Sequence, residues 1–139
     1  MKIGELARRT GLSTHTIRYY EKIGLLPYAD RDRGHQRDYD VSILSWVEFL
    51  GHLKATGMPI EQMLIYAKLR NLGDQTIHER RLVLENHRKK VEDHIQNLQK
   101  NLHLLNRKID VYQQIEKEMV STPPKDVDWE KRFQQLAKS

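Results

Sequence analysis

The fold of this chain is decided by residues 3–24, IGELARRTGLSTHTIRYYEKIG. At the start of this stretch, the i, i+3, i+4 and i+7 positions of a short amphipathic helix are filled by Ile3, Leu6, Ala7 and Thr10. Gly11 then predicts a tight turn, Ser13 is suited to cap a second helix, and Gly24 follows that helix, where a left-handed glycine is favoured. Two short helices joined by a glycine turn predict a helix-turn-helix.

The predicted second helix has one cationic and aromatic face. A stripe along that face is formed by His15, Arg18, Tyr19 and Lys22. On the other face, Ile17, Tyr20 and Ile23 can turn toward a core. Arg and Lys neutralise phosphates, and side chains near the helix N-terminus, including Thr16, can reach base edges in a major groove. We therefore predict that this helix reads DNA. A basic face that is merely solvated is the alternative, which the helix-turn-helix spacing disfavours.

A basic hairpin is predicted next. Residues 27–40, PYADRDRGHQRDYD, are too rich in turn-forming residues for a helix and fit two short strands around residues 32–35. The hairpin adds candidate DNA contacts at Arg31, Arg33, His35 and Arg37. Residues 1–37 hold eight Lys and Arg against four Asp and Glu, and the whole chain has 24 against 19, a formal charge of +5. This balance favours an anionic partner.

Two further helices complete a first domain, which we assign to residues 1–72. Asp40 is suited to cap a third helix that extends to about Thr56. Its predicted inward residues are Ile43, Leu44, Val47, Leu50 and Leu53. The fourth helix is predicted from about Ile60 to Leu72, and its inward residues are Ile60, Met63, Leu64 and Ala67.

A long helix follows within residues 73–121. From Thr76 to Ser121 there is neither Gly nor Pro, which predicts one helix of roughly 44 residues. Apolar residues recur on it at alternating spacings of four and three, the heptad seam of a coiled coil. The predicted interface consists of Leu84, Val91, Ile95, Leu98, Leu102, Leu105, Ile109, Tyr112 and Met119. A helix this long needs a partner, and a homodimer implies a pseudo-palindromic DNA site. The periodicity leaves open whether the two helices are parallel or antiparallel.

The rest of the sequence restricts the function classes. Residues 122–139 form a polar tail, begun by the helix-ending Thr122-Pro123-Pro124, with a short amphipathic helix that carries Trp129, Phe133 and Leu136. The chain has no cysteine, and its histidines lack chelating spacing, so we predict neither a metal nor a cofactor. The sequence shows no nucleophile–base pair, so we predict that the protein is not an enzyme. No signal peptide or membrane-length apolar run is present, so we expect a cytoplasmic protein.

Several segments together resemble the MerR family of bacterial transcription regulators. They are Ile3-Gly4-Glu5-Leu6-Ala7, Thr10-Gly11-Leu12-Ser13, Thr16-Ile17-Arg18-Tyr19-Tyr20-Glu21, Gly24-Leu25-Leu26-Pro27 and Arg37-Asp38-Tyr39. The resemblance covers residues 1 to about 72, and the long helix occupies the place of the family's dimerisation helix. The implied fold is all-α with a small β-hairpin wing: a winged helix-turn-helix head followed by a long antiparallel coiled-coil helix.

The same resemblance implies a mode of action. A homodimer would bind a promoter with an over-long spacer and would bend and untwist the DNA so that RNA polymerase can engage it. The positions that contact DNA in the family correspond to Thr16, Arg18, Tyr19, Arg37 and Tyr39. The helix from Ile60 would be a second wing.

Within the family, the short chain and the segments at residues 46–57 and 73–74 resemble the NmlR/AdhR type, which is associated with aldehyde and electrophile stress. That type has a cysteine on the third helix, where this sequence has His52, so thiol sensing does not carry over. His52 is a possible sensor position, because imidazole titrates near physiological pH, and a core or interface histidine is the alternative. The inducer, and whether the regulator activates or represses, do not follow from the sequence.

We thus predict a sequence-specific, homodimeric transcription regulator. The alternative is a structural coiled-coil protein that binds nucleic acid without regulating a promoter. The two differ in sequence preference, because only the regulator should prefer a palindromic site to non-specific DNA.

Overall fold

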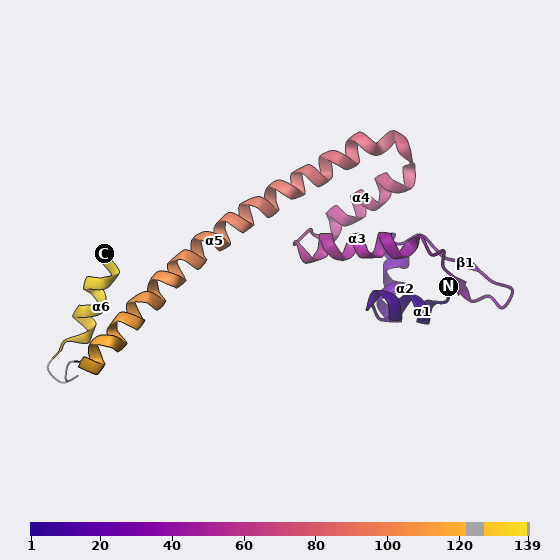
Figure 1. Cartoon of the computed structure of the whole chain (residues 1–139). Coiled ribbons are helices and arrows are strands. Elements are labelled where there is room, and N and C mark those ends of the chain that lie inside the picture. The colour runs from indigo at the N-terminus through magenta and orange to yellow at the C-terminus, as the bar shows by residue number, and fades with distance from the viewer. Residues whose placement is uncertain (122–126, 139) are drawn as a thin grey trace. The chain divides into compact units, whose positions relative to one another are not determined.

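The computed structural model describes residues 1–121 and 127–138 (Figure 1). Its first unit extends from Met1 to Val91, and its second begins at Glu92. In chain order the elements are α1 (Ile3–Thr10), α2 (Thr14–Ile23), β1 (Asp30–Arg31), β2 (Arg37–Asp38), α3 (Ile43–Ala55), α4 (Ile60–Leu72), the 3-10 helix η1 (Asp74–Thr76), α5 (Ile77–Ser121) and α6 (Trp129–Lys138). The predicted helical fold with a small hairpin is confirmed. Among the described residues, no helix has the length and apolar content that a membrane span requires.

The first two helices form the predicted helix-turn-helix. α1 ends at Gly11, whose φ of 76° is left-handed and whose N–H donates to the Ala7 carbonyl at 2.9 Å. Ser13 caps α2, because its hydroxyl oxygen accepts the Thr16 N–H at 3.0 Å. Gly24 closes α2 at a φ of 92°. Glycine reaches these angles without the steric penalty that a Cβ brings, so the ends of α1 and α2 are determined locally, as is the start of α2 by the Ser13 cap.

The predicted hairpin is also present. β1 and β2 pair antiparallel, with Arg31 opposite Arg37. The turn between them is organised by Asp32, whose Oδ1 accepts the N–H groups of Gly34 and Gln36, both at 2.9 Å. An aspartate that bonds the backbone a few residues ahead stabilises a tight turn. The two short strands therefore need little ladder bonding to hold their shape.

The core of the first unit lies between α1, α2, α3 and α4. Its buried residues are Leu6, Ile17, Tyr20, Leu25, Leu26, Tyr39, Ile43, Trp46, Val47, Leu50, Leu53, Met58, Met63 and Ala67. The Trp46 indole Nε1 donates to the Leu25 carbonyl at 2.9 Å, which satisfies the buried N–H and ties α3 to the segment after α2. The recognition helix candidate α2 is thus packed against a continuous apolar core.

Some details of the third and fourth helices differ from prediction. Asp40 does not cap α3; its carboxylate accepts the Ser42 N–H at 2.8 Å in the turn before the helix. Ile60, predicted to face inward, is exposed, because Met63 and Ala67 define the buried stripe of α4 and Ile60 lies at the helix end. The predicted inward Leu44 and Leu64 are half-buried.

The start of α5 belongs to the first unit. Leu84, predicted as a seam residue, is half-buried and packs against the head core, as does Val83. The Thr56 hydroxyl and His87 Nε2 lie 2.7 Å apart, which links the end of α3 to α5. Contacts within the chain therefore already cover part of the Leu84 side chain, and its place in the dimer seam stays a prediction.

In the second unit, α6 folds back along the end of α5 (Figure 1). Tyr112 and Phe133 meet in a T-shaped contact with ring centroids 4.8 Å apart. Arg132 Nε lies 2.9 Å from Glu118 Oε2, and this guanidinium lowers the pKa of the Glu118 carboxyl. Ile115, one turn before Glu118 on the same face, is only 2% exposed. The predicted amphipathic tail helix is confirmed, whereas the predicted helix end at residues 122–124 lies outside the described residues.

The other seam residues of the single chain lie largely in the open. The side chains of Ile95, Leu98, Leu102, Leu105, Ile109 and Tyr112 are between 47% and 61% exposed. Val91 is half-buried and Met119 is exposed. A regular stripe of exposed leucine and isoleucine is unfavourable in water. The stripe is therefore available to a partner helix.

Candidate nucleic-acid interface

α2 presents the predicted cationic and aromatic stripe to the outside of the first unit. Its exposed members are His15, Arg18, Tyr19 and Lys22. Ile17 and Tyr20, on the opposite side, are buried in the core. Within the described residues, neither Arg18 nor Lys22 makes an ion pair. Their charges are therefore free to neutralise phosphates.

The N-terminal end of α2 is organised before any ligand binds. Thr16 is half-buried, and its hydroxyl oxygen accepts the Ser13 hydroxyl at 2.9 Å. The Thr16 hydroxyl can still donate its own proton outward. His15 lies next to it and is exposed. The two residues predicted to reach base edges thus sit at a capped and ordered helix end.

The hairpin carries exposed cations at its tip. Arg31, Arg33 and His35 are all exposed, and Arg31 Nη1 donates to the His35 carbonyl at 3.2 Å. His35 has a φ of 61°, which is uncommon for a residue other than glycine and marks the tight turn. Lys2 pairs with Asp32, and this bond is the largest cause of the lowered pKa of the Asp32 carboxyl. The turn is therefore fastened to the segment before α1.

A buried carboxylate connects the hairpin to α2. Glu21 is 2% exposed, and Arg37 Nε lies 3.2 and 3.3 Å from its two carboxylate oxygens. The Tyr39 hydroxyl donates to the same carboxylate. Burial, followed by the hydrogen bond to Glu21 and then the Glu21 charge, raises the pKa of Tyr39. One carboxylate from α2 is thereby held by two side chains that flank the end of β2.

This arrangement changes the predicted roles of two residues. Tyr39 was predicted to contact DNA, but its side chain is 3% exposed and its hydroxyl is bonded to Glu21. Such a side chain cannot reach a phosphate without leaving the core. The Arg37 side chain is 23% exposed and already carries a carboxylate partner. Both side chains join the end of β2 to α2, and in this structure the buried Tyr39 hydroxyl is not available for the predicted DNA contact.

Glu21 was missed by the sequence prediction, although a signal was present. Ile17, Tyr20 and Glu21 stand at i, i+3 and i+4, so a carboxylate occupies the buried stripe of α2. An ionised side chain in that position requires a cation or several hydrogen bonds. The helical period could have identified the need for a partner. It could not have identified Arg37 as that partner.

The proposed sensor position lies away from the core. The His52 side chain is 74% exposed, with Nε2 3.8 Å from Glu48 Oε1 on the same helix. The alternative that His52 is a satisfied core residue is therefore wrong. In the described ranges, 1–121 and 127–138, no three His, Cys, Asp or Glu residues gather closely enough to hold a metal ion.

Comparison with known proteins identifies the family. The model of the MerR HTH family regulatory proteins matches residues 1–66. The regulator AdhR of Bacillus subtilis (strain 168) is 35% identical over 91 residues, which span 66% of this chain and 65% of AdhR. A MerR family regulator from Listeria monocytogenes aligns with a TM-score of 0.80 and 30% identity over 87% of this chain and 95% of its own. HiNmlR, a MerR family regulator that lacks the sensor domain and was solved bound to promoter DNA, aligns with a TM-score of 0.73 and 35% identity over 84% of this chain and 92% of its own. The chain belongs to the MerR family.

Membership of the MerR family decides between the two predicted functions. The relatives are DNA-binding transcription regulators, so the chain is a regulator and not a structural coiled-coil protein. The likeness to AdhR and HiNmlR agrees with the predicted NmlR/AdhR type. The chain has no cysteine, so it differs from that type at the predicted sensor position.

Proposed function

We propose that this MerR family regulator binds a pseudo-palindromic promoter site as a homodimer and distorts the DNA to control transcription. The observation that carries the proposal is the exposed cationic stripe of α2. Within the described residues, no carboxylate pairs with Arg18 or Lys22 of this stripe. With α2 in a major groove, His15 and Thr16 would face base edges. Arg18, Tyr19 and Lys22 would face phosphates.

The hairpin would act as a wing on the adjoining DNA backbone. Arg31, Arg33 and His35 are exposed at its tip and can reach phosphate oxygens. Arg37 and Tyr39 would act indirectly, because their bonds to Glu21 hold the hairpin beside α2. α4 would supply a second wing. This division assigns residues 1–72 to DNA binding.

Homodimerisation is supported by the exposed seam of α5, which we assign to residues 73–121. Completing the burial of one half-exposed apolar side chain contributes about 1 kcal/mol. From residue 95 to residue 112, the seam of each chain offers six of them: three leucines, two isoleucines and a tyrosine. A closed two-fold dimer buries the same stripe on both chains. Two heads related by that symmetry require a two-fold symmetric DNA site.

Promoter distortion is the step that controls transcription in this proposal. Bending or untwisting a short site requires of order 1 to 10 kcal/mol, which phosphate contacts from two heads can offset. RNA polymerase would then engage the altered promoter. HiNmlR, the relative solved with promoter DNA, supports this target. The role requires no catalytic step or cofactor, belongs in the cytoplasm, and fits a stress or effector response with His52 as a possible sensor position.

The proposal is tested by selecting bound DNA from a random pool with the full chain at physiological salt. A two-fold symmetric consensus is expected. The selected site is then compared with a scrambled site for wild type and for the stripe variant Arg18→Ala. Tight binding without a two-fold symmetric consensus would overturn the proposal.

A further inference from the structure

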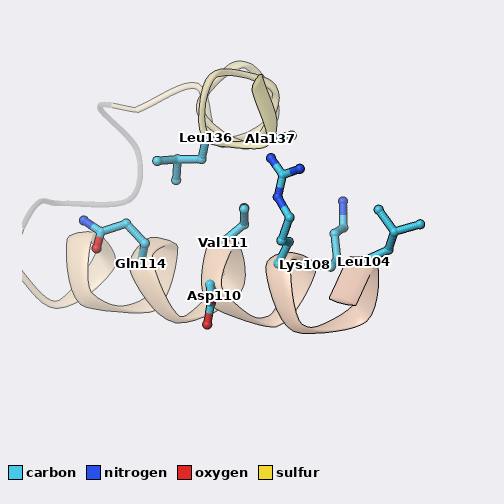
Figure 2. Close-up of a pocket in the computed structure, with 8 residues that line it drawn as sticks. Leu104, Lys108, Asp110, Val111, Gln114, Leu136 and Ala137 are labelled. Carbon is cyan, nitrogen blue, oxygen red and sulfur yellow. The ribbon is translucent and has the colours of Figure 1, made fainter. Parts of the chain in front are cut away.

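A pocket of about 390 Å³ lies between α5 and α6 in the second unit (Figure 2). Four of its lining residues are apolar: Leu104, Val111, Leu136 and Ala137. The other four are polar or charged: Arg107, Lys108, Asp110 and Gln114. This volume falls within the range of sites that hold small molecules, which combine apolar walls with a few polar groups. None of these residues takes part in the proposed DNA interface.

The charge of the pocket favours an anion. Arg107 makes no ion pair with any residue that the structure describes. In Figure 2, Lys108 extends toward α6, whereas the Asp110 carboxylate points to the opposite side of α5. Gln114 donates one Nε2 proton to Glu118 at 3.2 Å, and the second Nε2 proton can donate to an anion. Two cations beside the apolar side chains of Val111 and its neighbours match a carboxylate that carries an apolar chain.

The pocket and the seam lie on different sides of α5. The seam residues and the pocket residues lie on different stripes of the helix, at steps of 100° per residue, and the two stripes face nearly opposite directions. A partner helix on the seam therefore leaves the gap between α5 and α6 accessible. A pocket on the seam itself would be covered by the partner helix.

One pocket residue also touches the seam. Lys108 Nζ lies 5.7 Å from the ring centroid of Tyr112 and 5.9 Å from that of Phe133. Tyr112 is an exposed seam residue, and Phe133 belongs to α6. A cation over a ring face is attracted to it. An anion that draws Lys108 away from these rings would alter the packing at the edge of the seam.

We propose that the pocket between α5 and α6 binds a small amphipathic carboxylate, and that this binding moves Lys108 and so alters the packing at the edge of the dimer seam. The carboxylate pairs with Arg107 and Lys108, and its apolar chain lies against Leu104, Val111 and Leu136. The binding step requires only residues of the second unit. The transmission step rests on the proposed homodimer.

The binding step is tested by calorimetric titration of the full chain with octanoate. We expect saturable binding at one site per chain, with 1-octanol at least about tenfold weaker, because the alcohol lacks the charge that Arg107 recognises. Arg107→Gln should weaken octanoate at least about tenfold. The matched control is Lys100→Gln, an exposed cation on the same helix that does not line the pocket, and it should leave the affinity unchanged.

Three results would overturn the binding step: no saturable octanoate binding at millimolar concentration, equal binding of octanol, or an affinity that Arg107→Gln does not change. Circular dichroism of each variant checks that the helices are intact. Because Arg107 and Lys100 are exposed, neither substitution disturbs a core.

The transmission step is tested by sedimentation equilibrium with and without octanoate. We expect octanoate to change the dimer dissociation constant at least about threefold in wild type and not in Lys108→Gln. An equal response in both proteins would overturn it. A chain that binds octanoate but neither dimerises nor selects a DNA site would refute the proposed function and leave the pocket intact. A dimer that selects its DNA site but does not bind octanoate would refute only the proposed binding of a carboxylate at the pocket.

Discussion

Replacing Arg37 with alanine tests how the hairpin is held to α2. The Arg37 guanidinium contacts both oxygens of Glu21 at 3.2 and 3.3 Å, and Glu21 is 2% exposed. Among the described residues, the carboxylate in Arg37→Ala keeps only the Tyr39 hydroxyl as a partner. A buried charge without a counter-ion is strongly unfavourable.

The expected loss of stability in Arg37→Ala follows from how deeply Arg37 and Glu21 are buried. Removing one partner of a fully buried pair destabilises a protein by about 3 to 5 kcal/mol. The Arg37 side chain is 23% exposed, so water screens part of the interaction, and we expect a loss of about 2 to 3 kcal/mol. The matched control is Arg33→Ala at the exposed hairpin tip, which should stay within about 0.5 kcal/mol of wild type.

A double substitution separates the charge from the side chain. Adding Glu21→Gln to Arg37→Ala removes the uncompensated carboxylate and should restore at least about 1 kcal/mol of the loss. The free energy of unfolding is measured by urea denaturation, at one protomer concentration because dimer stability depends on it. If Arg37→Ala is as stable as Arg33→Ala, or if Glu21→Gln restores nothing, the buried pair does not stabilise the head as argued.

The same variants distinguish positioning from direct contact. A residue that neutralises one phosphate contributes about 0.9 to the slope of log affinity against log salt. If Arg37 only positions the hairpin, Arg37→Ala should weaken DNA binding and leave that slope unchanged. A slope that falls by about one would assign Arg37 to a phosphate instead.

Three further predictions address the stripe, the seam and the hairpin. Arg18→Ala should weaken binding to all DNA sequences and reduce the salt slope by about one in fluorescence anisotropy titrations, and an unchanged slope would contradict a phosphate contact. Leu98→Glu should convert the dimer to monomers in sedimentation equilibrium and remove operator binding, because it puts a charge at the centre of the seam, whereas Lys100→Glu off the seam should remain dimeric. The pKa of the Asp32 carboxyl is lowered from its ordinary value of 3.8, chiefly by Lys2, so its stabilisation is complete above that pH and is lost as the pH falls below it. Acid titration of unfolding should therefore be shallower for Asp32→Asn than for wild type, and identical profiles would refute the pairing.

Much of the fold was predictable because its signals are local. Gly11, Ser13 and Gly24 determine the ends of the first two helices through backbone conformation and one side-chain cap. The exposed side of α2 follows from helical period alone. The absence of Gly and Pro over residues 76–121 predicts one long helix, and the heptad spacing defines its apolar stripe.

The tertiary structure decided which side chains remain free. The basic hairpin and the family resemblance make Arg37 and Tyr39 candidate DNA contacts, yet both side chains turn to Glu21, which is 16 and 18 residues away in sequence. Likewise, the heptad pattern does not distinguish Leu84, which the head core partly covers, from Leu98, which remains exposed. Helical period assigns a residue to a face, because it depends only on neighbours along the chain. The partner that meets that face depends on which elements approach in space, and only the folded chain brings the buried carboxylate of α2 to the end of β2.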